Sequence, residues 1–240
     1  MNRTRIDWAQ FSWNPVVGCT KGCSYCYARR INARFHYIAD FSVPTFFLER
    51  LNEPQHVKKP RWVFVCSMGE LFDRLIPDSW RDQVFAAMRK APQHKYVILT
   101  KQGVLAGRFI ARRGFVLGHN IYIGMSVTID PEFSQALTLA NRLSAWQPRV
   151  RRVLCLEPLH GPIPSLSVEL AKHVRMGYPR KPWDWLILGA QTGPGAVAPE
   201  PAWIAELVEA ADAARIPVWV KDNAKPYCPP QYWRRRKPEV

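Results

Sequence analysis

Acidic residues are scarce in this sequence. Its 240 residues include 19 Asp and Glu against 34 Lys and Arg, which gives a formal net charge of +15. Such an imbalance disfavours basic partners and favours a polyanion, because each phosphate that pairs with Lys or Arg releases a counterion. Basic residues are grouped at 29–34, 108–113, 149–152 and 234–237. We therefore expect DNA or RNA as a partner, with a merely solvated basic surface as the alternative.

Long apolar stretches are also missing. No segment reaches the roughly 18 consecutive apolar residues that a membrane helix needs. The N-terminal stretch MNRTRIDWAQFSW has neither the apolar region nor the small-residue cleavage site of a secretory signal. We expect a cytoplasmic protein without membrane contact. In a reducing compartment its six cysteines serve as ligands, reactive groups or core residues rather than as disulfides.

Repeats, low-complexity segments and interdomain linkers are absent, and short apolar segments instead alternate with helical ones. NPVVGC is the first of the expected strands, and the others lie at 61–67, 95–101, 121–127, 151–158, 183–193 and 216–221. Strands that are apolar along their whole length predict a parallel sheet buried on both faces. Right-handed crossovers then allow a barrel or a doubly wound sheet. We expect a single α/β domain at 1–228, a partial (β/α) TIM-type barrel of about six to seven parallel strands, followed by a basic tail at 229–240.

Three cysteines are concentrated in the segment GCTKGCSYCYARR. Cys19, Cys23 and Cys26 follow the spacing C-x3-C-x2-C. Three thiolates from one short loop can hold a 4Fe-4S cluster and leave one iron free to bind a small molecule. The alternative is zinc with a fourth ligand such as His36 or Cys66. Against zinc, the sequence contains no second C-x2-C pair. The spacing favours the cluster.

This cysteine motif resembles that of the radical S-adenosylmethionine (SAM) superfamily. Tyr25 occupies the aromatic position before the third cysteine of that signature. The resemblance implies that SAM chelates the free iron and is cleaved to a 5′-deoxyadenosyl radical, which abstracts hydrogen from a substrate. It also implies a one-electron donor such as a flavodoxin or ferredoxin. The cofactors supply the difficult chemistry, while the protein positions and shields them.

A larger part of the chain is similar to one branch, the phage Gp37/Gp68-like (DUF5131) family. The matching stretches, in family order, are WNPVVGC, CYARR, VFVCSMGELF, ILTK, IGMSV, LEPLHGPI, LILGAQTGPGA and VWVK. Two departures are visible: the gap between the first two cysteines is shorter than in many members, and GAQTG replaces GGESG. The second departure places Gln191 where members have an acid. The resemblance implies radical SAM chemistry without defining a substrate.

The expected SAM contacts follow the strands, where the carboxyl ends of a parallel sheet meet. By resemblance, the turn after 61–67 holds the amino end of SAM, and Ser126 faces its ribose or carboxylate. A glycine-rich loop beginning at Gly189 lies near adenine. Glu70 has an alternative role as a helix-start carboxylate, and Asp73 is a weaker candidate for its contact with SAM. Ser126 has an alternative role as an ordinary turn residue. The full set of expected SAM contacts is Tyr25, Ser67, Gly69, Glu70, Ser126 and Gly189.

Glu157 is a carboxylate at the end of the apolar stretch VLCLE. Burying it without a partner would be costly, so we expect a role in the site or a pair with Lys101 or Lys221. These three residues are the expected catalytic group that shapes the substrate cavity. The sequence thus predicts a radical SAM enzyme acting on a nucleic acid or nucleotide, in base repair or modification. The alternative is a non-catalytic, zinc-containing nucleic-acid-binding protein.

Overall fold

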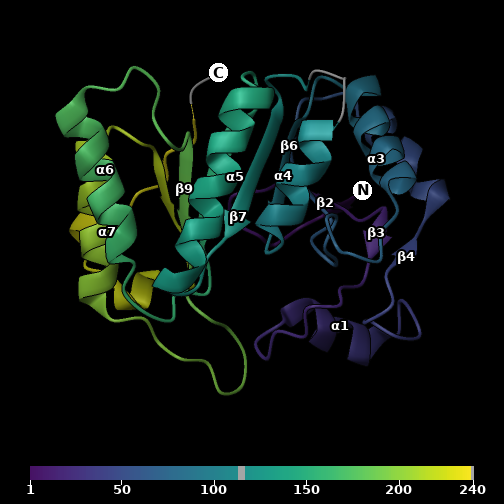
Figure 1. The fold of residues 1–240 in the computed structure, drawn as a ribbon. Helices are drawn as coiled ribbons and strands as arrows, with labels where there is room; N and C mark the ends of the chain where they lie inside the picture. The colour runs from purple at the N-terminus through teal and green to yellow at the C-terminus, as the bar shows by residue number, and fades with distance from the viewer. Residues whose placement is uncertain (113–116, 239–240) are drawn as a thin grey trace.

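The computed structural model describes residues 1–112 and 117–238. Its centre is a sheet with the strand order β1-β2-β5-β6-β7-β8-β9-β10 (Figure 1). β1 runs antiparallel to β2, and every later neighbouring pair is parallel. The bounds are β1 Asn2–Arg3, β2 Phe11–Trp13, β5 Trp62–Val65, β6 Lys95–Thr100, β7 Ile121–Ser126, β8 Arg151–Leu156, β9 Trp185–Leu188 and β10 Val218–Val220. The parallel part agrees with the expected six to seven strands.

Helices follow the strands in the alternating order that the sequence predicts. The α-helices are α1 Tyr27–Phe35, α2 Glu53–His56, α3 Asp78–Lys90, α4 Gly103–Arg112, α5 Phe133–Trp146, α6 Pro164–Met176 and α7 Pro201–Ala213. The 3-10 helices are η1 Leu48–Asn52, η2 Asp130–Glu132, η3 Lys225–Tyr227 and η4 Pro230–Tyr232. Figure 1 shows α1 apart from the others, beyond the ends of the strands. Within the described residues, no helix is long and apolar enough to cross a membrane.

Both faces of the sheet are buried, as strands that are apolar throughout require. Along β8, Leu154 and Leu156 pack in the core that the helices cover, whereas Val153 and Cys155 belong to a second cluster on the inner face. This inner cluster also contains Trp8, from the segment between β1 and β2. Successive residues of a strand point to opposite faces of the sheet. Because each face packs against its own apolar cluster, residues 153–156 of β8 are all apolar.

The first strand differs from the expected NPVVGC. The first parallel strand is β2, and the chain leaves the sheet after Trp13. Val16–Val17 forms β3, which pairs antiparallel with β4 (Thr45–Phe46) in a separate two-stranded sheet. Pro15 explains the break, because proline has no N–H to donate to a central ladder.

The basic residues near the C-terminus lie along the edge of the sheet. The N–H of Val220 donates to the carbonyl of Arg234 (2.7 Å), and the N–H of Arg236 donates to Val218 (2.9 Å). The Nζ atom of Lys237 lies 5.0 Å from the ring centroid of Trp219. Residues 234–237 therefore cover β10. Of the tail expected at 229–240, residues 239–240 lie outside the described residues.

Candidate active site

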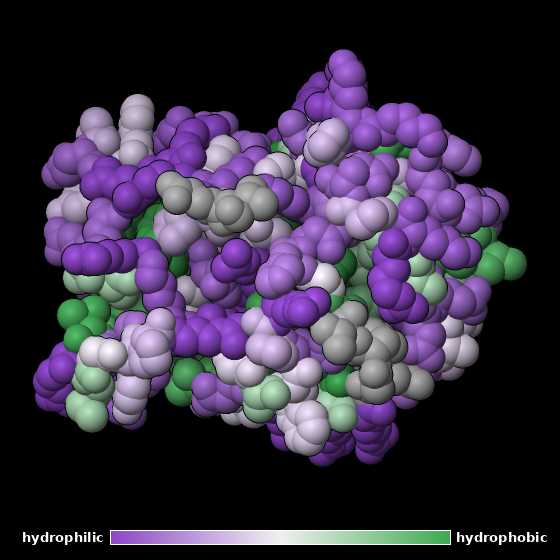
Figure 2. Space-filling view, turned by 90° about the horizontal axis from the view of Figure 1, so that it is seen from above, coloured by the Kyte–Doolittle hydropathy of each residue, from purple (hydrophilic) through white to green (hydrophobic). Residues whose placement is uncertain are grey.

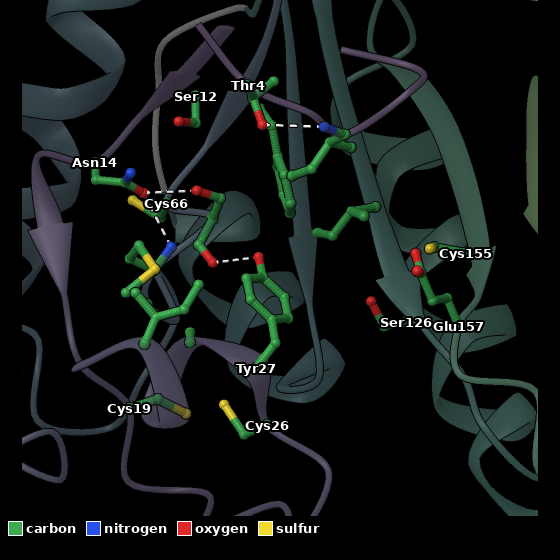
Figure 3. Close-up of a pocket in the computed structure, with 18 of the residues that line it drawn as sticks. Thr4, Ser12, Asn14, Cys19, Cys26, Tyr27, Cys66, Ser126, Cys155 and Glu157 are labelled. Carbon is green, nitrogen blue, oxygen red and sulfur yellow. Dashed lines mark hydrogen bonds between the residues drawn. The ribbon is translucent and has the colours of Figure 1, made fainter. Parts of the chain in front are cut away.

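A cavity of about 970 Å³ lies at the carboxyl ends of the strands and reaches the inner face of the sheet. Figure 3 shows Cys19 and Cys26 on one side of it, with Ser126 and Glu157 across from them. The cavity lining includes these expected site residues: Cys19, Cys23, Cys26, Tyr25, Ser67, Gly69, Glu70, Lys101, Ser126, Glu157 and Lys221. Residues from distant parts of the chain thus meet in one place.

The start of the cysteine loop is docked on the turn after β5. The N–H of Gly18 donates to the carbonyl of Met68 (3.0 Å), and the N–H of Glu70 donates to Gly18 (3.1 Å). Gly18 has φ +109°, and an added Cβ would lie 2.9 Å from Cα of Pro44. An L side chain rarely adopts this backbone conformation. Glycine at 18 therefore lets the loop pass close to the segment around Pro44 while its backbone bonds to the turn.

Asp73, the weaker alternative to Glu70 in the sequence, holds the loop a second time. Its side chain is fully buried. One carboxylate oxygen accepts from both the N–H and the Oγ of Thr20, each at 2.8 Å, and the other accepts from the N–H of Leu75 (3.0 Å). Thr20 directly follows Cys19, so Asp73 fixes the backbone beside the first cysteine.

Replacing Asp73 by Ala tests this anchor. The N–H and hydroxyl of Thr20 would be left without their acceptor, which should lower the free energy of unfolding by about 2–3 kcal/mol. We also expect the protein to retain less iron after anaerobic purification. Denaturant unfolding and iron analysis measure the two effects. Asp40→Ala is the matched control, because Asp40 accepts from the N–H and Oγ of Ser42 in the same way but is exposed. Equal losses in the two variants would contradict the anchoring role.

The sulfur atoms of two cysteines accept backbone hydrogen bonds. The N–H of Lys21 donates to Sγ of Cys19 and the N–H of Arg29 donates to Sγ of Cys26, each at 3.4 Å. Burial raises the pKa of Cys19 to about 12, so without a metal this group is a neutral thiol. Hydrogen bonds to sulfur stabilise the negative charge of thiolate ligands in iron–sulfur sites. The loop therefore offers an environment suited to metal-bound thiolates.

The side chains do not converge on a single metal ion. Among residues 1–112 and 117–238, no three His, Cys, Asp or Glu side chains form a group that could hold one. The sulfurs of a tetrahedral zinc site lie about 3.8 Å apart, given Zn–S bonds of about 2.3 Å. In a 4Fe-4S cluster each cysteine binds a different iron, so the thiols need not meet at one point. Three thiols of one loop that line one cavity are a donor set that could hold such a cluster.

Ser67 lies in a hydrogen-bonded group where β2, α1 and the turn after β5 meet. Its Oγ donates to Oδ1 of Asn14 (3.1 Å), which also accepts from the N–H of Met68 (2.9 Å). The carbonyl of Ser67 accepts from the hydroxyl of Tyr27 (2.5 Å). Figure 3 shows these contacts on the wall beside Cys66. Asn14 and Tyr27 were missing from the expected site. Asn14 would have been found had the first strand been placed at β2, because it directly follows that strand.

Glu70 is buried and bonded to protein groups through both oxygens. Oε1 accepts from the hydroxyl of Thr100 (2.7 Å) and the N–H of Phe72 (3.0 Å), while Oε2 accepts from the N–H of Lys101 (2.9 Å). Burial raises its pKa, and the three hydrogen bonds oppose that rise. Glu70 thus ties the turn after β5 to the end of β6. Its alternative as a helix-start carboxylate is wrong, since α3 begins only at Asp78.

Lys101 is a cation on the cavity wall beside the cysteine loop. Its Nζ atom is buried and has no hydrogen-bond partner among the described residues. It lies 5.4 Å from the ring centroid of Tyr25, which packs edge-to-face on His160 at 5.1 Å. A buried ammonium without a partner is costly. The cavity beside Tyr25 is therefore suited to an anionic group of a ligand.

Glu157 pairs with Lys221, one of its two expected partners, rather than with Lys101. The Lys221 ammonium donates to Oε1 of Glu157, and Asn223 Nδ2 donates to the same oxygen at 3.3 Å. Burial alone would lower the pKa of Lys221, but attraction to Glu157 outweighs it and the pKa is raised. The pair is charged and lies across the cavity from the cysteines.

Gly189 lies behind Glu157 rather than on the cavity wall. A Cβ at this position would lie 2.7 Å from Cδ of Glu157. Glycine here leaves the space that the carboxylate occupies. The expected contact between Gly189 and adenine has no counterpart in the cavity lining formed by the described residues.

We expect Gly189→Ala to displace Glu157 and to lower the free energy of unfolding by about 1–3 kcal/mol. The cost should nearly disappear in a Glu157→Ala background, where the obstructing atoms are gone; thermal unfolding of the four proteins measures this coupling. Gly161→Ala is the control, since its nearest neighbour would be 3.9 Å away. If Gly189→Ala lowered the free energy of unfolding equally in the Glu157→Ala background, the proposed steric conflict with Glu157 would be wrong.

Ser126 and Cys155 are paired in register at the ends of β7 and β8, and both line the cavity. Burial raises the pKa of Cys155 to about 12, and a hydrogen bond from Ser126 opposes the rise. Cys155 is therefore an uncharged thiol. The role of Ser126 toward SAM stays a prediction.

Comparison with known proteins identifies the family. A family model described as a protein of unknown function, DUF5131, matches residues 3–238. The chain belongs to the DUF5131 family. The family resemblance predicted from the sequence is thereby confirmed. No curated protein matches this DUF5131 protein.

Among solved structures, the DUF5131 protein is similar to spore photoproduct lyase. With the lyase complexed with dinucleoside spore photoproduct, the TM-score is 0.55 at 9% identity, covering 79% of this chain and 58% of the lyase. A mutant of the lyase with the same ligand gives 0.52 at 10% identity, covering 79% and 57%. The match thus spans less than two thirds of the lyase. At this identity it shows the fold, and the expected partial TIM-type barrel is confirmed.

Proposed function

We propose that this DUF5131 protein is a radical SAM enzyme in which Cys19, Cys23 and Cys26 hold a 4Fe-4S cluster. The observation that carries the proposal is that three thiols of one loop line the same cavity as the carboxyl ends of the barrel strands. The fold is shared with spore photoproduct lyase, a radical SAM enzyme. When both are bound, cluster and SAM supply one-electron cleavage of SAM and abstraction of a hydrogen atom from the substrate. A flavodoxin or ferredoxin serves as electron donor.

The wall beside the cysteine loop positions SAM. Lys101 binds its carboxylate, because the buried ammonium lacks any other partner among the described residues. The turn with Ser67 and Gly69 borders its amino end, and Glu70 holds that turn against β6. Ser126 lies on the facing strand end.

Glu157 and Lys221 form the substrate end of the cavity. The Lys221 ammonium donates to the Glu157 carboxylate in a largely buried place. Such a pair orients polar groups of a substrate with a fixed donor and a fixed acceptor. Because the pKa of Lys221 is raised, its amine stays protonated. Excluding water from this region strengthens both contacts.

The substrate class that we propose is a nucleic acid or nucleotide, for base repair or modification. The net charge of +15 supports it. A second hollow of about 370 Å³ lies where β8 begins, at the end of the strands away from the cavity, and offers a further contact for the phosphates of a long nucleic acid. Its lining cations include Arg149, Arg151, Arg180 and Lys181. Burial and the neighbouring arginines lower the pKa of Arg180, as expected where cations are crowded. Figure 2, seen from the end where the strands begin, shows hydrophilic side chains over most of that face.

Anaerobic purification tests the cluster. We expect a brown protein with about four iron atoms per chain. A colourless protein with one zinc would replace the proposal by that of a zinc-containing binding protein.

Binding to DNA or RNA should weaken steeply as salt is added. Between 50 and 200 mM salt we expect the affinity to fall at least about tenfold, because added cations compete with Lys and Arg for the phosphates. Fluorescence anisotropy with a labelled oligonucleotide measures it. Salt-independent binding, or none, would remove the nucleic-acid part of the proposal.

A further inference from the structure

The segment between β1 and β2 forms one wall of the cavity, and nothing in the sequence pattern singled it out. Residues 4–8 all line the cavity. Hydrogen bonds within the segment hold its shape: the N–H of Ile6 donates to the side-chain Oγ1 of Thr4 (3.2 Å), and the N–H of Ala9 donates to the carbonyl of Ile6 (3.0 Å). Figure 3 shows Thr4 on the side of the cavity away from the cysteines.

Asp7 has one oxygen engaged and one unsatisfied. Oδ2 accepts from the N–H of Asp222 at 2.8 Å and lies 3.9 Å from the guanidinium of Arg235. Oδ1 is buried and has no partner among the described residues. The side chain is 12% exposed. The carboxylate is therefore fixed in position by one oxygen, while the other is an acceptor without a partner on a residue that lines the cavity.

Trp8, the residue after Asp7, carries a hydrogen-bond donor without a partner in the part of the chain that the structure describes. Its side chain is 1% exposed, with its ring 4.9 Å from that of Phe64 and 5.8 Å from that of Trp185. Its Nε1–H is buried without a partner among the described residues. Native proteins satisfy nearly all buried polar atoms, with ordered water or a ligand where no protein group is at hand. Two such atoms on consecutive residues of one cavity wall indicate a ligand with a complementary edge.

We propose that Asp7 and Trp8 bind the hydrogen-bonding edge of the substrate nucleobase. Asp7 accepts from a ring or exocyclic N–H, and Trp8 donates to a neighbouring carbonyl oxygen or ring nitrogen. Every nucleobase presents a donor beside an acceptor on its pairing edge. A carboxylate repels phosphate, so this wall selects the base, while cations elsewhere hold the backbone. The inference rests on the proposed function only for the substrate class.

The geometry separates this site from that of SAM. Lys101 lies beside Tyr25 of the cysteine loop, whereas Asp7 contacts Asp222 at the end of β10. The adenine of SAM is itself a nucleobase, however, so the experiment needs to distinguish the two ligands.

Calorimetric titration of the purified protein with the four 2′-deoxynucleosides, and separately with SAM, provides the test. At least one deoxynucleoside should bind. Asp7→Ala should weaken that binding about tenfold or more, and Trp8→Phe about fivefold, because each removes one partner of a buried hydrogen bond. Asp7→Asn, of nearly equal size, should give a smaller loss, since a neutral acceptor is weaker than a charged one. SAM binding should change less than twofold in all three.

Trp219→Phe is the matched control. Its Nε1 is likewise buried and unpartnered among the described residues, but Trp219 lies outside the set that lines the cavity. It should leave deoxynucleoside binding unchanged. Binding that survives all three variants, a loss confined to SAM, or no binding of any deoxynucleoside would overturn the inference. Because the titration needs no turnover, a protein that lacks the cluster but binds deoxynucleosides through Asp7 would refute the proposed function alone.

Discussion

We expect the replacement of Cys23 by Ala to lower the iron content of the anaerobically purified protein from about four atoms per chain to less than about one. Cys23 is one of three thiols that line the cavity from a single loop. With it gone, two cysteines remain, and a cluster held by only two thiolates dissociates. Formation of 5′-deoxyadenosine from SAM should fall at least about a hundredfold, because cleavage depends on the cluster. Iron analysis, absorbance and chromatography of the products measure these changes.

Cys228→Ala is the control for this experiment. Cys228 is a buried free thiol that packs in the helix-covered core. Its removal should leave iron and product unchanged. If Cys23→Ala kept its iron, or if Cys228→Ala lost as much, the assignment of the ligands would be wrong.

Breaking the Glu157–Lys221 pair should lower the stability of the folded protein. Glu157→Ala or Lys221→Ala leaves a charge without its partner in a place where the side chains are 25% and 14% exposed, respectively. We expect each to lower the free energy of unfolding by about 2–3 kcal/mol, less than for a fully buried pair. The double variant should cost clearly less than the sum, because neither charge is then stranded. Denaturant unfolding of the four proteins gives the coupling energy.

The ion pair between Arg236 and Asp212 serves as the comparison, with side chains that are 55% and 32% exposed. Its coupling energy should be at most about 1 kcal/mol. Additive effects of Glu157→Ala and Lys221→Ala would mean that the two groups do not interact in solution.

Much of the fold was predictable because it depends on local patterns. Strands buried on both faces, such as β9, are apolar throughout, and this identifies a parallel sheet. The error at the first strand has a local cause too, since Pro15 between Trp13 and Val16 ends one strand before the other begins. Weighing its missing N–H would have corrected the prediction.

The site was predictable only where its residues follow a strand or share a motif. The cysteines and Glu157 were predicted in that way, and they line one cavity. The contact of Asp73 with Thr20 and that of Asp7 with Asp222 were not predicted, because they join segments far apart in the sequence. No periodicity or spacing marks such a pair. Gly189 was expected to contact adenine, and in the structure its close neighbour is the side chain of Glu157. The sequence does not show which way that side chain points.

The most direct measurement is the release of 5′-deoxyadenosine. The protein, loaded with iron and sulfide under anaerobic conditions, is incubated with SAM and a strong reductant such as dithionite. Product that accumulates with the protein and falls to background with Cys23→Ala is the predicted result. A sample that contains about four irons per chain, binds SAM and still releases no 5′-deoxyadenosine would contradict the proposed chemistry.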